Sequence, residues 1–145
     1  MARPLVFDAS IFIQAARGRI PLERIVDPLA SGQAFMSSVV AHELWAGTRN
    51  REDAEALSMV LRGFERLGHV LTPSHEDWIL AGRLVNRYRR LYGALNPRDH
   101  SHDILIVLSA SQVDAVVITT NLRHMDRWAE LARRAGRSVR VRSEA

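Results

Sequence analysis

The chain has 145 residues, of which 47% are hydrophobic and 25% charged, and its formal net charge at pH 7 is +4. All twenty basic residues are arginines, and cysteine does not occur. The lack of lysine excludes a Walker A phosphate loop and Schiff-base chemistry, and the lack of cysteine excludes a thiol nucleophile, a disulfide framework and a zinc–thiolate site.

The length suits one domain, residues 1–145, with a core of its own. No apolar run approaches the length of a membrane span, and the N-terminal segment reaches Asp8 too early for a secretory signal, so we expect a cytoplasmic protein. The positive charge favours a polyanionic partner, although a GC-rich coding bias also explains an all-arginine set.

Short apolar segments alternate along the chain with segments whose apolar residues recur at helical spacing. Capping residues and glycines mark several helix ends, notably Ser37 or Ser38, Gly47, and the Ser74–Asp77 segment. In chain order the pattern predicts a strand at 5–7, a helix from 11, a helix at 22–29, a strand at 34–36, helices at 39–44 and 54–67, a strand at 69–72, helices at 78–91 and 99–111, a strand at 116–119, a helix at 121–136 and a strand at 139–141.

This alternation of strands and helices is typical of an α/β protein. We expect a three-layer α/β/α fold with a central, mainly parallel sheet of about five strands. In such sheets, ligands bind outside the carboxyl ends of the strands. The sequence therefore directs attention to polar residues that follow the predicted strands.

Polar side chains follow the predicted strands closely. Asp8 comes directly after the first strand, and Asn121 comes two residues after Thr119, at the end of the strand 116–119. Glu43 lies in the second turn of the helix after the second strand. Asp103 precedes a long apolar run, where a carboxylate is poorly solvated unless a positive charge binds it. Oxygen ligands gathered at one edge suit Mg²⁺ or Mn²⁺.

A carboxylate cluster of this kind is suited to phosphodiester hydrolysis. Cations held by the carboxylates neutralise the scissile phosphate, lower the pKa of a bound water and stabilise the leaving oxygen. No protein nucleophile is needed, which agrees with a chain that has neither cysteine nor lysine.

Four segments resemble, in order, the motifs of PIN-domain ribonucleases, and most closely those of the VapC-type toxins of bacterial toxin–antitoxin pairs. These segments are VFDAS at 6–10, SVVAHELWAG at 38–47, DILIVLSA at 103–110 and ITTNLRHM at 118–125. The resemblance covers essentially the whole chain. It implies a PIN-like fold and a Mg²⁺- or Mn²⁺-dependent endoribonuclease that cuts RNA, forms a homodimer and is held inactive by a cognate antitoxin protein whose peptide fills an apolar groove.

The resemblance also assigns site residues. Asp8, Glu43 and Asp103 match the acids that hold the metal and act in catalysis. Ser10 and Thr119 match the hydroxyl groups that support the site, beside the first acid and before the fourth position.

Two positions depart from the family pattern. Asn121 stands in the fourth catalytic position, where many relatives have Asp, and His124 replaces an acid that some relatives carry. The site therefore loses negative charge, which puts a second metal ion in doubt. Asp99, four residues before Asp103, assists through water if the predicted helix already includes it.

Arginines at helical spacing are candidates for binding the RNA backbone. Arg83, Arg87 and Arg90 share one helix face, and a second group lies between residues 133 and 142. Both groups can equally be solvated surfaces.

Several other interpretations stay open. Asp8 and Asn121 are common helix-capping residues. The histidines near the acids are read as surface or packed groups, and Trp45, Trp78 and Trp128 as core or partner-interface residues rather than base-stacking ones. The competing functions are a PIN-like RNA- or partner-binding module weakened in catalysis by Asn121, a metal-free ribonuclease with histidine acid and base, and an Asp8 phosphotransferase.

Overall fold

A parallel five-stranded sheet forms the centre of the computed structural model, which describes residues 2–144. The strand order is β3-β2-β1-β4-β5, and every neighbouring pair is parallel. The strands are β1 (Leu5–Phe7), β2 (Ala34–Ser37), β3 (Val70–Leu71), β4 (Val116–Thr119) and β5 (Arg140–Ser143). The predicted α/β/α class and the five-stranded parallel sheet are confirmed.

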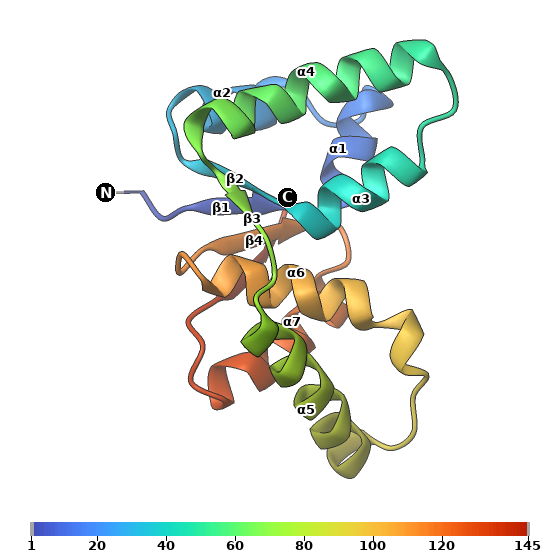
Figure 1. Ribbon diagram of the computed structural model, residues 1–145, viewed down its shortest axis with the longest axis vertical. Helices are drawn as coiled ribbons and strands as arrows, with labels where there is room; N and C mark the ends of the chain where they lie inside the picture. The colour runs from blue at the N-terminus through green and yellow to red at the C-terminus, as the bar shows by residue number, and fades with distance from the viewer. Residues whose placement is uncertain (1, 145) are drawn as a thin grey trace.

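Helices cover both faces of this sheet (Figure 1). On one side lie α1 (Ala9–Ala16), α2 (Glu23–Ala30), α3 (Ser38–Ala46) and α4 (Arg51–Leu67). On the other side lie α5 (His75–Tyr92), α6 (Ser101–Ser111) and α7 (Leu122–Arg134), with a short 3₁₀ helix, η1 (Pro97–Asp99), before α6. Within residues 2–144, no helix is both long and apolar enough to cross a membrane.

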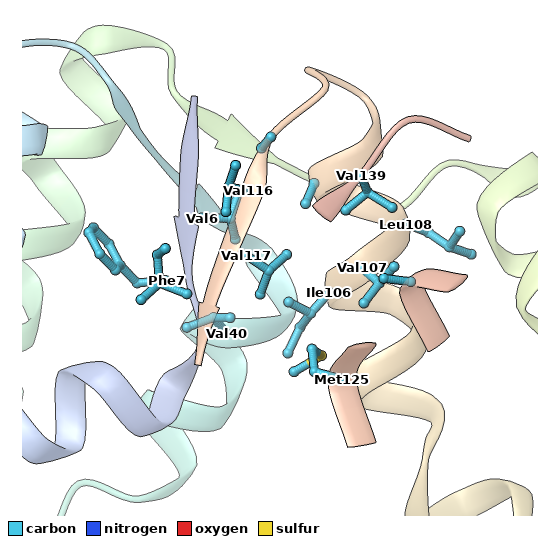
Figure 2. Packing of buried hydrophobic residues seen from close by; sticks show 14 of the residues in the cluster. Val6, Phe7, Val40, Ile106, Val107, Leu108, Val116, Val117, Met125 and Val139 are labelled. Carbon is cyan, nitrogen blue, oxygen red and sulfur yellow. The ribbon is translucent and has the colours of Figure 1, made fainter. Parts of the chain in front are cut away.

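Helix α6 is the most deeply buried helix of the fold, since every residue from Ile104 to Ala110 is buried. Figure 2 shows its Ile106 side chain between Val117 of β4 and Met125 of α7. Each fully buried aliphatic side chain of this kind contributes about 1.5–3 kcal/mol. The core therefore fixes α6, and with it Asp103 in its first turn, against the sheet.

Side-chain caps start several helices where the sequence predicts them. Ser37, rather than Ser38, caps α3 by accepting a hydrogen bond from the Val39 amide at 3.2 Å. Ser74 and Asp77 form a complete capping box at the start of α5. At the end of α4, Gly68 adopts the left-handed conformation, φ 68°, that closes a helix and favours glycine.

The predicted helix 99–111 begins two residues later than expected. The Asn96 side chain accepts a hydrogen bond from the Arg98 amide, and Pro97 opens a 3₁₀ turn instead of an α-helix. This turn ends at His100, and α6 starts at Ser101. Asp99 is exposed on the 3₁₀ turn and does not share a helix face with Asp103, so the condition for its predicted assistance is not met.

The three tryptophans differ in their environments. Trp128 is buried, with 2% exposure, as a core residue should be. Trp45 and Trp78 are 42% and 57% exposed, so the expectation of core packing is wrong for both, while the partner-interface and base-stacking interpretations stay open for them.

A buried ion pair joins the start of α5 to the segment between α7 and β5. Asp77 is 1% exposed, and its carboxylate accepts hydrogen bonds from the Ser74 amide, Gln112 and Arg137. Arg137 Nη1 lies 2.8 Å from Asp77 Oδ1 and also donates to Ser111 at the end of α6. Burial raises the pKa of Asp77, but these hydrogen bonds and the Arg137 charge outweigh burial and lower the pKa below its usual value.

We predict that Asp77→Asn lowers the free energy of unfolding by about 3 kcal/mol, because it leaves Arg137 facing an uncharged partner in a largely buried position. Arg137→Gln should cost a similar amount, and the double variant less than the sum of the two, with a coupling of about 1 kcal/mol or more. Chemical denaturation of the four proteins measures these values.

Asp126→Asn is the matched control. It removes a carboxylate 3.9 Å from Arg133 that is 53% exposed, and an exposed pair of this kind contributes about 0–1 kcal/mol. A loss for Asp126→Asn as large as that for Asp77→Asn would contradict the structural role of the buried pair.

Candidate active site

Asp8 is fixed in one orientation at the carboxyl end of β1. It is 8% exposed and serves as the N-cap of α1, with Oδ1 accepting a hydrogen bond from the Ala9 amide at 2.8 Å. Oδ2 accepts hydrogen bonds from Ser10 Oγ at 3.0 Å and Thr119 Oγ1 at 2.9 Å. The capping interpretation is therefore correct for Asp8, yet the two hydroxyl donors go beyond what a cap needs and hold a charged carboxylate in place.

The same two hydroxyl groups join the end of β1 to the end of β4. Thr119 Oγ1 accepts a hydrogen bond from the Asn121 amide at 3.0 Å, and Ser10 Oγ accepts one from the Thr120 amide at 3.2 Å. Each hydroxyl thus donates to Asp8 and accepts from the loop that leads into α7. The structure places Ser10 and Thr119 beside Asp8, as the sequence predicts.

Glu43 reaches this edge of the sheet from α3. Its Oε1 atom is buried and has no hydrogen-bond partner among residues 2–144, and its Oε2 atom lies 3.9 Å from Nδ1 of His102. Burial, followed by the negative charges of Asp8 and Asp103, raises the pKa of Glu43 to about 7, although His42 partly offsets the rise. Burying a carboxylate oxygen without a hydrogen-bond partner lowers the stability of the fold unless a cation binds the oxygen.

Asp103 comes from the opposite side, in the first turn of α6. Burial and the charge of Asp8 raise its pKa, while His100, His124 and His102 act in the other direction. The positive end of the α6 helix dipole also favours its ionised form. Asp8, Glu43 and Asp103 therefore meet at the carboxyl edge of the sheet, within electrostatic reach of one another.

The donor chemistry of this site fits a hard divalent cation. All three acids offer carboxylate oxygens, and the unpaired Glu43 Oε1 and the mutual repulsion of the acids are the features that a bound cation compensates. Within residues 2–144, no three His, Asp or Glu side chains lie close enough together to form a metal-binding group.

Asn121 is held at this edge by its backbone amide, which donates a hydrogen bond to Thr119 Oγ1. The residue is exposed and precedes α7, but its side chain makes no capping hydrogen bond. The capping interpretation is therefore wrong for Asn121. Asp99 is exposed and is not among the charges that act on Asp103.

Four histidines surround the acids, and the sequence predicts that three of them, His42, His100 and His102, are surface or packed residues. The rings of His42 and His102 meet edge to face with centroids 5.6 Å apart, beside Glu43. His100 and His124 lie within electrostatic reach of Asp103. The signal in the sequence was adjacency, because His42 precedes Glu43 directly and His102 precedes Asp103 directly.

The first group of arginines predicted to bind RNA lies on α5, which packs against α6 and α7. Arg83, Arg87 and Arg90 are exposed and form no ion pair with any residue of 2–144. Among residues 2–144, no ion pair joins them to the three acids.

The protein is a three-layer α/β/α protein with acids at the carboxyl edge of its parallel sheet. Comparison with known proteins assigns its family. Residues 5–131 match the family model of the PIN domain. The chain therefore belongs to the PIN domain family, as the sequence motifs predict. No curated protein matches the chain significantly.

Several solved structures share its fold over nearly their whole length. The DNA-bound VapBC complex of Salmonella typhimurium has 20% identity and a TM-score of 0.64, covering 98% of both chains. VapBC-1 of nontypeable Haemophilus influenzae has 19% identity and a TM-score of 0.66, covering 96% of both. VapBC2 of Rickettsia felis, bound to a promoter DNA fragment, has 16% identity and a TM-score of 0.64, covering 97% of this chain and 98% of the other.

The raised pKa of Glu43 predicts a pH-dependent cost to stability in the metal-free protein. Between about pH 4.5 and 7 the folded chain keeps a proton on Glu43 that the unfolded chain loses, so this group lowers the free energy of unfolding as pH rises. We expect Glu43→Gln to be about 1–2 kcal/mol more stable than the parent at pH 8, after discounting for its 31% exposure, and nearly equal to it near pH 5.

Denaturation of both proteins with EDTA across this pH range measures the difference. Glu65→Gln, which changes an exposed glutamate on α4, should differ from the parent by the same small amount at every pH. Adding Mg²⁺ at pH 8 should stabilise the parent more than Glu43→Gln. A Glu43→Gln difference that does not change with pH would contradict the electrostatic account.

Proposed function

We propose that this chain is a divalent-metal-dependent endoribonuclease, with residues 1–145 as a single catalytic domain, and that it acts as the toxin of a toxin–antitoxin pair. The observation that carries the proposal is the convergence of Asp8, Glu43 and Asp103 at one sheet edge, with a buried Glu43 oxygen left unpaired. Membership of the PIN domain family supports nuclease activity, and PIN domains are generally dependent on divalent metals.

In this proposal the three acids hold Mg²⁺ or Mn²⁺. When bound, the cation neutralises the scissile phosphate and lowers the pKa of an attacking water. Ser10 and Thr119 fix the direction of the Asp8 carboxylate through its Oδ2 atom. With its acceptor atoms set in advance, Asp8 loses little freedom when it binds the cation.

Glu43 couples metal binding to pH. Its raised pKa means that a large share of the metal-free molecules carry a proton on Glu43 near neutral pH. Carboxylates bind cations in the ionised form, so this proton must leave Glu43 when the cation enters. Binding is therefore expected to be tighter above pH 7 than below it.

The partners in this proposal are an RNA substrate, a cognate antitoxin and a second copy of the chain. Large apolar side chains exposed on α1, α3 and α4, namely Ile13, Trp45 and Met59, support a protein partner on that side of the sheet. The similar structures of Salmonella, Haemophilus and Rickettsia are VapBC proteins, and two of them are bound to DNA.

RNA cleavage tests the proposal directly. Purified protein incubated with total RNA should cut it with Mg²⁺ or Mn²⁺ and not with EDTA. Asp103→Asn removes a metal-binding charge and should lower the cleavage rate by about two orders of magnitude or more. Cleavage that survives EDTA would favour the metal-free histidine mechanism instead.

Asp126→Asn, prepared in the same way, is the matched control. Asp126 is exposed and takes no part in the site, so this variant should cut as fast as the parent. If Asp103→Asn also cuts as fast as the parent, the site assignment is wrong.

Asn121 supports one alternative, a PIN-like binding module weakened in catalysis. The exposed amide contributes no negative charge, so the site depends on three carboxylates. Under the alternative, Asn121→Asp restores an activity that the parent lacks. Under the main proposal, the parent is already active, and Asn121→Asp changes mainly the concentration of metal needed.

A further inference from the structure

Four aromatic rings and the guanidinium of Arg127 form a contiguous cluster between the end of α5, the turn before α6 and the middle of α7. The Tyr88 ring stacks on Trp128 at 5.1 Å and lies 5.0 Å from the Tyr92 ring. His100 lies 5.6 Å from Trp128. The guanidinium carbon of Arg127 lies over the Tyr92 ring, 4.4 Å from its centroid.

The inner side chains of this cluster are buried or half-buried, and its outer side chains are exposed. Trp128 is buried and Tyr88 is half-buried, whereas Tyr92 is 45% exposed and Arg127 is exposed. The outer pair, Tyr92 and Arg127, is referred to below as the Tyr–Arg pair. Packing on the inner rings holds Tyr92 in place, so a ligand that binds the pair does not have to order a loose ring.

The contacts of Arg127 differ from those of Arg133 and Arg134, which lie on the same helix. Arg133 and Arg134 lie beside Asp126 and Glu130. Arg127 forms no ion pair with any residue of 2–144 and is held by the rings of Tyr88 and Tyr92. A guanidinium over a ring keeps its N–H donors available at the edge, while its plane offers a second stacking surface.

The Tyr–Arg pair adjoins the carboxylate site through two histidines. His100, which packs on Tyr88 and Trp128, also acts electrostatically on Asp103. His124, which acts on Asp103 as well, lies one helical turn before Arg127 on α7. Figure 1 shows α5, α6 and α7 grouped on one side of the sheet.

We propose that the Tyr–Arg pair binds an unpaired nucleobase of a single-stranded RNA whose backbone passes the carboxylate site. The inference rests on the proposed function, because it takes RNA as the substrate. The base stacks on the aromatic and guanidinium planes, which accept any base because every base has a π-face. Arg127 adds hydrogen bonds to a base edge or to the adjacent phosphate.

Two RNA probes separate base stacking from simple charge attraction. One is a fluorescein-labelled oligoadenylate of about 12 nucleotides, and the other is an abasic ribose-phosphate chain of the same length. Fluorescence anisotropy measures Kd for both in Mg²⁺, with Asp103→Asn as the background so that neither probe is cut.

Substitutions of Tyr92 test the ring itself. Tyr92→Leu should weaken binding of oligoadenylate about tenfold and leave the abasic probe within about twofold, since a stacked base contributes roughly this much. Tyr92→Phe keeps the ring and should bind both probes as the parent does. Equal losses on the two probes, or no loss on oligoadenylate, would overturn the proposal.

Substitutions of Arg127 provide an independent test if Tyr92→Leu fails to fold. Arg127→Lys keeps the charge and loses the planar group, so it should weaken oligoadenylate about fivefold and the abasic probe hardly at all. Arg66→Gln on α4 removes an exposed charge elsewhere and should affect both probes equally and slightly. An Arg127→Lys protein that binds oligoadenylate like the parent would overturn the proposal.

Cleavage of total RNA by the parent separates the two claims. If the parent cuts RNA but binding is insensitive to Tyr92 and Arg127, only the base-binding inference fails. If binding depends on Tyr92 and Arg127 as described but the parent cuts no RNA under any metal condition, only the proposed function fails.

Discussion

The three carboxylates brought together at one edge of the sheet are the constraint on which the rest of this structure depends. Parallel pairing of β1 with β2 and β4 gathers strand ends at that edge, and α3 and α6 add Glu43 and Asp103. Burial and mutual repulsion raise the pKa of both, so the fold holds this arrangement at a cost to its own stability. The nearby histidines offset only part of that cost.

The sequence predicted the positions that depend on local pattern. Asp8 follows an apolar strand, so the order of elements alone places it at the sheet edge, whereas Asp103 stands out because a carboxylate before an apolar run is poorly solvated. The start of α6 was placed wrongly, because Pro97 is compatible with the first turn of either an α-helix or a 3₁₀ helix. Long-range contacts such as Asp77 with Arg137 had no signal in the sequence, since nothing local pairs residues so far apart.

The arginines show why composition alone could not assign roles. Arg137 is a structural residue that pairs with a buried carboxylate, and Arg127 lies on aromatic rings without any acidic partner among residues 2–144. Arg83, on α5, is exposed and unpaired within the same residues. Only the contacts of each guanidinium separate a group that stabilises the fold from one that remains available to a ligand.

The central claim is that Asp8, Glu43 and Asp103 form a cation site, and anomalous diffraction from crystals grown with Mn²⁺ tests it most directly. The account predicts an anomalous peak at the carboxyl edge of the sheet, with oxygens of all three acids within about 2.0–2.6 Å of the ion or of its bound waters. A well-ordered crystal with saturating Mn²⁺ at pH 8 and no peak among these acids would contradict the account.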